Sequence, residues 1–368
     1  MTEDTIGKTA RRRSRPVKVG GVVIGGESPV SIQSMTNTDS RDFGSTFSQM
    51  CALREAGCDI VRMTVPDAES ARVLGRLKKS GVGIPVVADI HFDWKLAIAA
   101  IEEGADKVRI NPGNIGDESR VREIARAAAD RGIPVRVGIN GGSLEKRLLE
   151  KYGGPVPEAL AESALENADM LLRNGLEDIV VSIKSSSVAN MIAANRILAE
   201  RCDLPLHLGV TEAGTAYSGT VKNAVGIGAL LCDGIGDTVR VSLTADPVEE
   251  IRAAREILKA CGCLRTGGLN VISCPTCGRT RIDIIGIAGR FEERAKAEKL
   301  DGISAKVAIM GCAVNGPGEA READFGIAGG NGDAVFFRNG AIEKKISEDS
   351  IVDVLMEELR NFGNKLPV

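Results

Sequence analysis

From about residue 30 to residue 262 the chain alternates short runs of β-branched residues with longer segments rich in Ala, Leu and Glu. In segments such as 117–132 and 246–261 the apolar residues recur three and four positions apart, as in helices that cover one face of a sheet. The short runs predict eight strands, at residues 29–35, 59–65, 84–91, 106–112, 133–140, 178–185, 204–210 and 237–243.

This alternation predicts an α/β fold. Eight strands that alternate with helices over roughly 230 residues match a (β/α)8 barrel of the TIM type in both number and length. A doubly wound open sheet is the alternative, because it is assembled from the same strand–helix–strand units.

The pattern changes after residue 264. Residues 281–289 predict a strand, residues 290–300 a helix and residues 305–314 a second strand, which together form a βαβ unit. Residues 333–346 predict a hairpin that turns at Asn339-Gly340, residues 326–334 a glycine-rich loop, and residues 348–362 a closing helix. The sequence therefore predicts a barrel at 1–264 and a smaller α+β domain at 265–368.

Length and charge restrict the function classes. A chain of 368 residues exceeds the usual size of one hydrophobic core. A net charge of −3 favours neither nucleic acid nor a membrane surface as partner. We expect the basic stretch at residues 10–16 to be a solvated tail rather than a nucleic-acid arm. The chain shows neither a signal peptide nor a membrane span, so the sequence predicts a cytoplasmic protein.

Cationic side chains lie near the ends of the predicted strands, where barrel enzymes carry their active sites. They are Arg62, Arg109, Arg136, Lys184 and Arg240, and Asn111 and Asn140 accompany them. A single arginine could simply pair with an acid at the rim of the barrel. Five cations on successive strands instead predict binding of a polyanion, such as a phosphorylated or diphosphorylated small molecule.

Acid–base candidates accompany these cations. The two histidines of the chain, His91 and His207, both fall near predicted strand ends, and Glu212 follows one of the strands. One histidine alone is more often structural, but both at the same predicted mouth favour ligand contact or proton transfer. Glu212 is a further candidate acid.

Three thiols and a carboxylate gather in the second domain, as Cys274, Cys277, Cys312 and Glu319. A zinc site, a redox dithiol and an iron–sulfur site are all compatible with a C-x2-C pair followed by a distant cysteine. The domain lacks histidine, which structural zinc often uses, and a dithiol has no need of Cys312. Three thiolates favour a [4Fe–4S] cluster, with the oxygen of Glu319 as a candidate for the fourth iron.

The other six of the nine cysteines form two groups. Cys51, Cys58, Cys202 and Cys232 fall in or at the ends of helical stretches and are expected to act as small core residues. Cys261 and Cys263 lie at the predicted domain junction and are alternative cluster ligands.

The chain resembles the 4-hydroxy-3-methylbut-2-enyl diphosphate synthase family, the iron–sulfur enzymes of the bacterial non-mevalonate isoprenoid pathway. The resemblance runs from about residue 15 to the C-terminus. Two cysteine motifs carry it most specifically, "SCPTCGR" from residue 273 and "GCAVNGPGEA" from residue 311. Supporting motifs in the barrel are "SIQSMTNT", "ADIHFD", "VRINPGNIG", "VRVGING", "LGVTEAG" and "GIGDTVRVSLTADP".

The resemblance implies a cofactor and a reaction. The [4Fe–4S] cluster would be held by Cys274, Cys277, Cys312 and Glu319. The substrate would be 2-C-methyl-D-erythritol 2,4-cyclodiphosphate, whose ring is opened reductively with loss of a hydroxyl as water. Two electrons would arrive singly from a flavodoxin or a ferredoxin.

The resemblance also implies a head-to-tail homodimer in which the cluster domain of one chain caps the barrel of the other. Asn315 would then reach the substrate from the partner chain, and Glu212 and His91 would handle protons. The candidate substrate-binding residues are Arg62, His91, Arg109, Asn111, Arg136, Asn140, Lys184, His207, Lys222, Arg240 and Arg265.

Two hypotheses of other classes remain. The first is a non-redox barrel enzyme for a phosphorylated substrate, with structural zinc in the second domain. The second is an iron–sulfur sensor that binds nucleic acid through residues 10–16, which the net charge does not favour.

Overall fold

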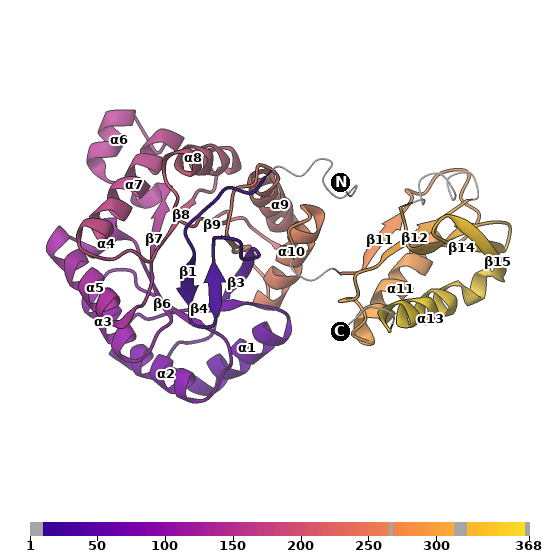
Figure 1. The fold of residues 1–368 in the computed structure, drawn as a ribbon, viewed down its shortest axis with the longest axis horizontal. Coiled ribbons are helices and arrows are strands. Elements are labelled where there is room, and N and C mark those ends of the chain that lie inside the picture. Colours follow the sequence, from indigo (N-terminus) through magenta and orange to yellow (C-terminus); the bar gives the residue numbers. More distant parts are fainter. Residues whose placement is uncertain (1–9, 265–267, 313–321, 365–368) are drawn as a thin grey trace. The chain divides into compact units, whose positions relative to one another are not determined.

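A computed structural model describes residues 10–264, 268–312 and 322–364 (Figure 1). The chain divides into two compact units between Cys263 and Leu264. Each unit is described here by itself.

The first unit is a closed barrel of eight parallel strands, ordered β8-β7-β6-β5-β4-β3-β10-β9. A parallel bridge between Val181 and Leu206 joins β8 to the residue before β9, so the sheet closes on itself. All eight predicted strands are confirmed, and the open doubly wound sheet is excluded. The strands are β3 (Ser31–Met35), β4 (Ile60–Thr64), β5 (Val86–Asp89), β6 (Lys107–Ile110), β7 (Val135–Asn140), β8 (Ile179–Lys184), β9 (His207–Leu208) and β10 (Thr238–Val239).

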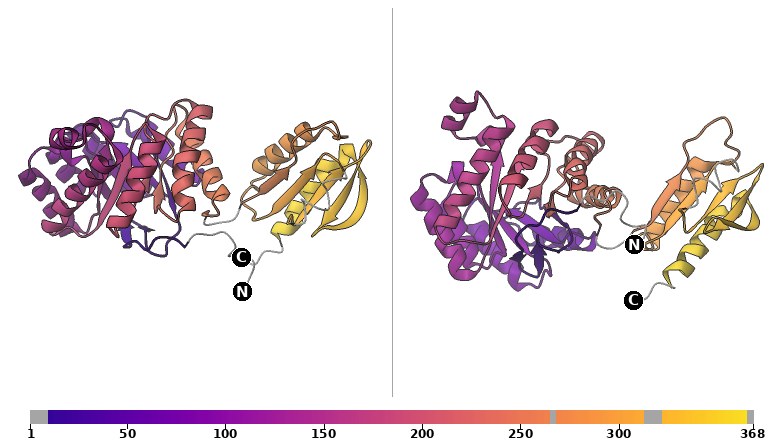
Figure 2. Two further views of the ribbon diagram at one scale, coloured as in Figure 1. Left: turned by 90° about the horizontal axis from the view of Figure 1, so that it is seen from above. Right: turned by 45° about the horizontal axis from the view of Figure 1, so that its top comes forward.

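Helices surround the barrel, as the views in Figures 1 and 2 show. Several start at an aspartate whose carboxylate accepts a hydrogen bond from a backbone N–H of the first turn, for example Asp67 from Ser70 and Asp117 from Arg120. The long helices are α1 (Phe43–Glu55), α2 (Ala68–Lys79), α3 (Trp94–Glu102), α5 (Glu118–Arg131), α7 (Pro157–Arg173), α8 (Val188–Arg201), α9 (Ala216–Cys232) and α10 (Pro247–Ala260). Shorter ones are α4 (Pro112–Ile115), α6 (Lys146–Tyr152) and the 3-10 turn η2 (Gly141–Ser143).

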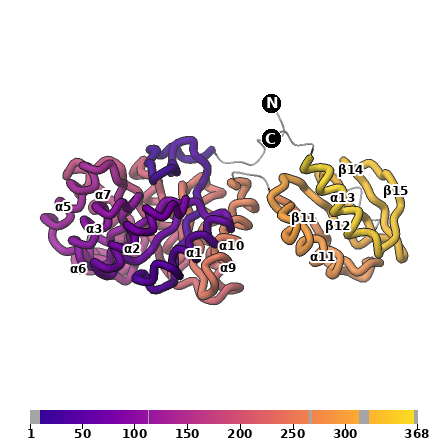
Figure 3. The backbone as a smooth tube through the Cα atoms, turned by 90° about the horizontal axis from the view of Figure 1, so that it is seen from below, coloured from indigo at the N-terminus to yellow at the C-terminus, as the bar shows by residue number. Residues whose placement is uncertain are grey.

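The amino end of the barrel is closed by a hairpin that the sequence did not predict. It consists of β1 (Val17–Val19) and β2 (Val22–Ile24), which pair antiparallel. The apolar side chains of this hairpin form one buried cluster with residues of β4, β5 and β8: Val17, Val19, Ile24, Ile60, Val87 and Val180. The indigo start of the tube in Figure 3 traces this segment.

The expectation of a solvated basic tail is wrong. The Arg11 guanidinium pairs with Asp237 at 2.8 Å, and Arg12 donates to the carbonyl of Cys202 at 2.6 Å. Arg15 pairs with Asp203 at 2.7 Å. The stretch packs on the barrel because acids and carbonyls distant in sequence meet its cations there, which no local pattern reveals.

The second unit contains a mixed five-stranded sheet, ordered β11-β12-β13-β14-β15. Its first three strands are parallel, and β14 and β15 run antiparallel. The predicted hairpin is confirmed, with Asn339 (φ 48°) and Gly340 (φ 76°) in the left-handed conformations of its two-residue turn. The elements are β11 (Asn270–Ser273), α11 (Ile284–Ala297), β12 (Lys306–Met310), β13 (Phe325–Gly329), β14 (Asp333–Arg338), β15 (Ala341–Ser347), η3 (Glu348–Ser350) and α13 (Ile351–Gly363).

The strand predicted at 281–289 is wrong, because α11 covers most of that segment. Ile284, Ile287 and Phe291 are buried at helical spacing, and Asp283 caps the helix by accepting from the N–H of Gly286. A short apolar run fits either structure, and here its burial against the sheet selects the helix. A βαβ unit is present, but its first strand is β11 rather than residues 281–289.

The loop predicted at 326–334 is also wrong in its first part. Residues 325–329 form β13, in the middle of the sheet. A Cβ at Gly326 would lie 2.4 Å from the carbonyl oxygen of Ala308 on the adjacent strand, so close strand packing explains this glycine.

Throughout the described ranges, the helices are too short or too polar to cross a bilayer.

Candidate functional site

The barrel mouth, meaning the residues around two neighbouring cavities lined by the barrel strands and the segments that follow them, collects most of the predicted substrate residues. The inner cavity has a volume of about 240 Å³, and its predicted residues are Arg62, His91, Arg109, Arg136, Asn140, Lys184 and Arg240. The outer cavity has a volume of about 600 Å³ and shares His91, Arg109 and Asn140 with the inner one. Asn111 and Glu212 line only the outer cavity.

Strand register explains why these side chains meet. Parallel pairing sets Asp89 beside Arg109, Arg109 beside Arg136, and Asn140 beside Lys184. Since side chains alternate along a strand, partners in register point to the same face. The barrel interior therefore receives a continuous series of polar side chains from neighbouring strands.

Asp89 connects the cations of the inner cavity, and the sequence analysis gave it no role. Its carboxylate lies 3.0 Å from Nη1 of Arg109 and 3.5 Å from Nε of Arg62. Burial alone would raise the pKa of Asp89, but the charges of Arg62, Arg109 and Arg136 outweigh burial and lower this pKa. Asp89 lies in register with Arg109 on the neighbouring strand. This relation depends on strand pairing, so the sequence alone does not show it.

Arg136 carries a charge that the protein leaves largely uncompensated. The side chain is only 1% exposed, and its Nη1 donates to Ser182 Oγ at 2.7 Å. Its Nε and Nη2 have no hydrogen-bond partner among the described residues. A buried cation without a partner is costly, so a bound anion at this cavity would be strongly favoured.

Lys184 is a second buried cation of the inner cavity. Burial lowers its pKa well below the usual value, and the charge of Arg240 lowers it further, followed by those of Arg62 and Arg136. An anion placed among these groups would oppose that effect and favour the charged ammonium. The electrostatics of the inner cavity therefore suit a ligand with several negative charges.

Arg240 differs because an acid on α10 accompanies it. Its Nη2 lies 3.0 Å from Oε1 of Glu250, a buried residue that also accepts from Ser34 Oγ at 2.9 Å. The sequence analysis missed Glu250, because nothing in a helical pattern shows that one of its acids faces the barrel. This pairing makes Arg240 a weaker anion site than Arg136.

Two glycines leave room for the cations. A Cβ at Gly138 would lie 2.6 Å from Nε of Arg109. A Cβ at Gly209 would lie 3.0 Å from Nζ of Lys184 and 2.5 Å from the carbonyl oxygen of Arg240. These contacts are too close, so the absence of a side chain at both positions permits the observed side-chain arrangement.

The rim of the mouth carries the acid–base candidates. His91 lines both cavities, and its Nε2 lies 3.9 Å from Asp89. Glu212 is exposed and has a left-handed backbone with φ of 53°, which is uncommon for a residue other than glycine. Asn111 donates from Nδ2 to Ser143 Oγ at 2.6 Å, which orients its amide.

His207 and Lys222 line neither cavity. The expected position of His207 at the mouth is wrong, because His207 lies at the amino end of β9 and is fully buried in the barrel. Burial, and then the neighbouring Arg136 and Lys184, lower the pKa of His207 well below its usual value. Lys222 is exposed on α9, and Arg265 lies outside the described residues.

The thiol edge of the second unit comprises the carboxyl ends of β11 and β12 and the turn after β11. Ser273 pairs with Ile309, so Cys274 and Cys312 leave neighbouring strands on the same side of the sheet. The N–H of Gly311 donates to Cys274 Sγ at 3.2 Å, and Cys312 is buried. This contact orients the Cys274 sulfur at the edge of the sheet.

Cys277 lies in the turn that follows β11. Its N–H donates to Thr280 Oγ1 at 3.1 Å, and its carbonyl accepts from the N–H of Thr280 at 3.0 Å. Its thiol is exposed, and its pKa is lowered first by the N–H of Arg279 and then by the Arg279 side chain. The turn therefore presents the Cys277 thiol to solvent, with its pKa lowered.

The donors at this edge fit an iron–sulfur site in kind, since they are sulfurs assisted by N–H groups. Asn315 and Glu319 lie outside the described residues. Within the described ranges, no three His, Cys, Asp or Glu side chains are grouped closely enough to bind a metal ion. The other cysteines lie in the barrel unit; Cys58 is buried as expected, whereas Cys232 is exposed rather than in the core.

Comparisons with known proteins cover both units. Residues 14–255 match the family description "GcpE TIM-barrel domain", and residues 270–361 match "GcpE protein C-terminal domain". A protein of Ruminiclostridium cellulolyticum named 4-hydroxy-3-methylbut-2-en-1-yl diphosphate synthase (flavodoxin) is 54% identical over 349 residues, covering 95% of this chain and 98% of its own. A Geobacter sulfurreducens protein of the same name is 54% identical over 354 residues, covering 96% and 98%.

A likeness to a solved structure supports the barrel alone. Dihydropteroate synthase from Stenotrophomonas maltophilia superposes with a TM-score of 0.50 at 14% identity. The match covers 69% of this chain and 100% of that one. At this identity the likeness shows a common fold and says nothing of activity.

Proposed function

Because the chain belongs to the GcpE family, we propose that it is an iron–sulfur oxidoreductase that makes (E)-4-hydroxy-3-methylbut-2-enyl diphosphate in isoprenoid precursor biosynthesis. The substrate is 2-C-methyl-D-erythritol 2,4-cyclodiphosphate, whose ring is opened reductively with loss of a hydroxyl as water. The observation that carries the proposal is the presence, in one chain, of a polycationic cavity and a thiol edge. Family membership gives no support to the non-redox, zinc-containing alternative.

Residues 1–264 bind the diphosphate. Arg136 and Lys184 form no ion pair within the described residues and are left to bind the anion. Arg62 and Arg109 are held in place by Asp89. Arginine side chains suit phosphate oxygens because their N–H groups can bind in pairs. His91, Asn111, Asn140 and Arg240 complete the proposed binding set around the two cavities.

Residues 265–368 hold the redox cofactor. Cys274, Cys277 and Cys312, with Glu319, would hold a [4Fe–4S] cluster, which supplies single electrons to the substrate when bound. The thiol edge contributes the N–H of Gly311 and the turn at Thr280, which orient two of the sulfurs. Flavodoxin is the proposed electron donor, because the relatives' names specify it, and ferredoxin is the second candidate.

Loss of the hydroxyl as water requires a proton. Glu212 and His91 are the candidates, because both line the outer cavity and neither is held in a tight ion pair. Asp89 is an unsuitable donor, since its lowered pKa keeps it ionised. We assign Asp89 the task of orienting Arg62 and Arg109.

We further propose a cytoplasmic homodimer in which the second unit of one chain completes the barrel mouth of the other. Asn315 and Glu319 would act there, on a segment outside the described residues. The proposed cluster needs its cysteines as thiolates, which fits a reducing compartment such as the cytoplasm. His207, Lys222 and Arg265 stay predictions of the sequence, and we base no step on them.

The test is the EPR spectrum of anaerobically purified, dithionite-reduced protein with and without the cyclodiphosphate. A [4Fe–4S] signal that changes on addition is expected. Bound zinc without iron in fully reconstituted protein would overturn the cofactor assignment. A cluster signal indifferent to the cyclodiphosphate would overturn the substrate while leaving the cofactor.

A further inference from the structure

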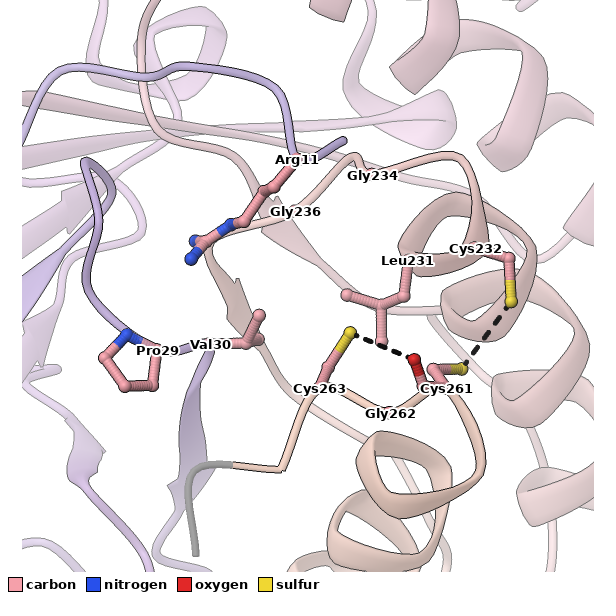
Figure 4. A pocket seen from close by; sticks show the side chains of 10 residues that line it. All are labelled: Arg11, Pro29, Val30, Leu231, Cys232, Gly234, Gly236, Cys261, Gly262 and Cys263. Atoms are coloured by element: carbon pink, nitrogen blue, oxygen red, sulfur yellow. Dashed lines mark hydrogen bonds between the residues drawn. The ribbon is translucent and has the colours of Figure 1, made fainter. Parts of the chain in front are cut away.

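Three cysteines of the barrel unit meet around a cavity that the proposed reaction does not use (Figure 4). Cys232 is the last residue of α9, Cys261 is the residue that caps α10, and Cys263 follows two positions later. The cavity has a volume of about 380 Å³, and Arg11, Val30 and Leu231 line it together with the thiols.

The thiols of Cys232 and Cys261 are neighbours. Their sulfurs lie 4.0 Å apart, with the Cys232 thiol donating to the Cys261 sulfur. A disulfide needs about 2 Å between its sulfurs. Rotation of the two side chains at the ends of their helices can supply the remaining approach, because neither sulfur is enclosed in the core.

Cys263 is placed differently. Its thiol donates to the carbonyl oxygen of Cys261 at 3.4 Å, and Figure 4 shows that this contact runs to the backbone rather than to either neighbouring sulfur. Cys232 and Cys261 are therefore the pair that the structure presents for a bond, and Cys263 is a matched thiol beside it.

The two sulfurs differ in access. Cys232 is exposed, whereas Cys261 is half-buried and accepts the Cys232 thiol as a hydrogen-bond donor. Burial, and then the neighbouring Cys232, raise the pKa of Cys261 to about 12. An oxidant from solution would therefore react with Cys232 first, and the less exposed Cys261 would react in the second step.

We propose that Cys232 and Cys261 form a redox-active dithiol that is converted to a disulfide by a low-molecular-weight disulfide such as oxidised glutathione. The Cys232 thiolate attacks one sulfur of the oxidant, forming a mixed disulfide and releasing one thiol. Cys261 then loses its proton to solvent and attacks the Cys232 sulfur as a thiolate, the mixed disulfide breaks, and the second small thiolate leaves and takes up a proton. Two protein thiols are oxidised and one small disulfide is reduced to two thiols, so two electrons and two protons are transferred.

The position of this pair gives the bond a consequence. It would link the ends of α9 and α10, and α10 is the last helix before the chain passes to the second unit at Leu264. The barrel unit would gain a covalent link across residues distant in sequence, which stabilises a fold mainly by restricting its unfolded chain.

The experiment uses the anaerobic holoenzyme treated with oxidised glutathione, then digested with trypsin and mapped by mass spectrometry. The expected product links peptide 223–240, which contains Cys232, to peptide 260–265, which contains Cys261 and Cys263. Because both thiols fall in one peptide, Cys263→Ser is the matched control and should retain the link. Cys261→Ser should reduce the linked fraction more than tenfold and leave glutathione on Cys232.

Three results would overturn the proposal. The first is a link that survives Cys261→Ser but disappears in Cys263→Ser. The second is a bond between two chains in place of one within a chain. The third is a pair that stays reduced in the folded protein while the urea-unfolded protein oxidises. Circular dichroism of the reduced serine variants shows whether each still folds.

Discussion

The barrel mouth and the thiol edge both use the carboxyl ends of parallel strands, but they distribute their chemistry differently. At the mouth, cations from β4, β6, β7, β8 and the end of β10 surround one cavity. At the thiol edge, two neighbouring strands and one turn carry all the described sulfur donors. Because the cations come from many strands, losing one of them should lower the substrate affinity only in part. Because few ligands hold the proposed cluster, losing one of them should prevent the cluster from binding.

The largest effect is expected at the thiol edge. Cys274→Ala removes a proposed cluster ligand and should reduce both iron content and turnover at least ~100-fold. Cys51→Ala, which removes a half-buried thiol of α1, is the control and should retain iron. Iron and sulfide analysis of the anaerobic proteins gives the measurement. An iron-replete Cys274→Ala protein would remove the contrast between the two regions.

A single loss at the mouth should be milder. Arg109→Ala removes one charge-assisted contact to phosphate, typically about 1.5–3 kcal/mol, so substrate affinity should fall ~10- to 100-fold. The visible absorption of the cluster should not change. Titration with the cyclodiphosphate measures the affinity, and Arg122→Ala on the exposed face of α5 serves as control. Loss of cluster absorption in Arg109→Ala would show that the two regions are not separable.

A smaller change tests whether the space around the cations, as well as their charge, determines substrate binding at the barrel mouth. Gly138→Ala places a Cβ 2.6 Å from Nε of Arg109 and should displace this guanidinium, raising KM about tenfold. Gly142→Ala is the matched control, because a Cβ there meets nothing within 4 Å. Steady-state kinetics of both variants give the answer. Equal KM values would mean that Arg109 has another position equally good for binding.

The last prediction concerns stability rather than turnover. A carboxyl whose pKa is lower in the folded protein stabilises it above the unfolded pKa, about 3.9, and that contribution is lost as the pH falls through the folded pKa. Asp89→Asn should therefore lower the free energy of unfolding by about 3 kcal/mol at pH 7. The difference from the parent protein should shrink once the pH falls below about 4.

Urea unfolding followed through Trp94, the only tryptophan of the chain, measures this effect in the barrel. Asp203→Asn is the control, because the ion pair of Asp203 with Arg15 is exposed and should contribute less than about 1 kcal/mol. A pH-independent difference for Asp89→Asn would mean that its ionisation does not hold the cations in place.

The sequence was sufficient to predict residues whose position follows from a strand pattern or from a cysteine motif. The eight barrel strands, the hairpin at Asn339-Gly340 and the final helix were predicted where they occur. The cations of the mouth followed from the period of two within each strand, and the thiol edge from motif spacing. These features are local, so each can be inferred from a short window of residues.

Side chains that pair across distant parts of the chain could not be predicted from the sequence. Asp89 beside Arg62 and Arg109, and Glu250 beside Arg240, depend on which strands and helices become neighbours. The N-terminal hairpin and the arginines that precede it also needed acids and apolar residues far along the chain.

The sequence by itself determined the barrel, the sites of its cations, and the family. The tertiary structure decided which side chains are buried and which charges form ion pairs. Among the described residues, Arg136 is buried and forms no ion pair, Arg240 pairs with Glu250, and His207 lies inside the barrel rather than at its mouth. The physical reason is that alternation along a strand fixes the face on which a side chain lies. Only closure of the barrel brings faces together and determines which charges are compensated.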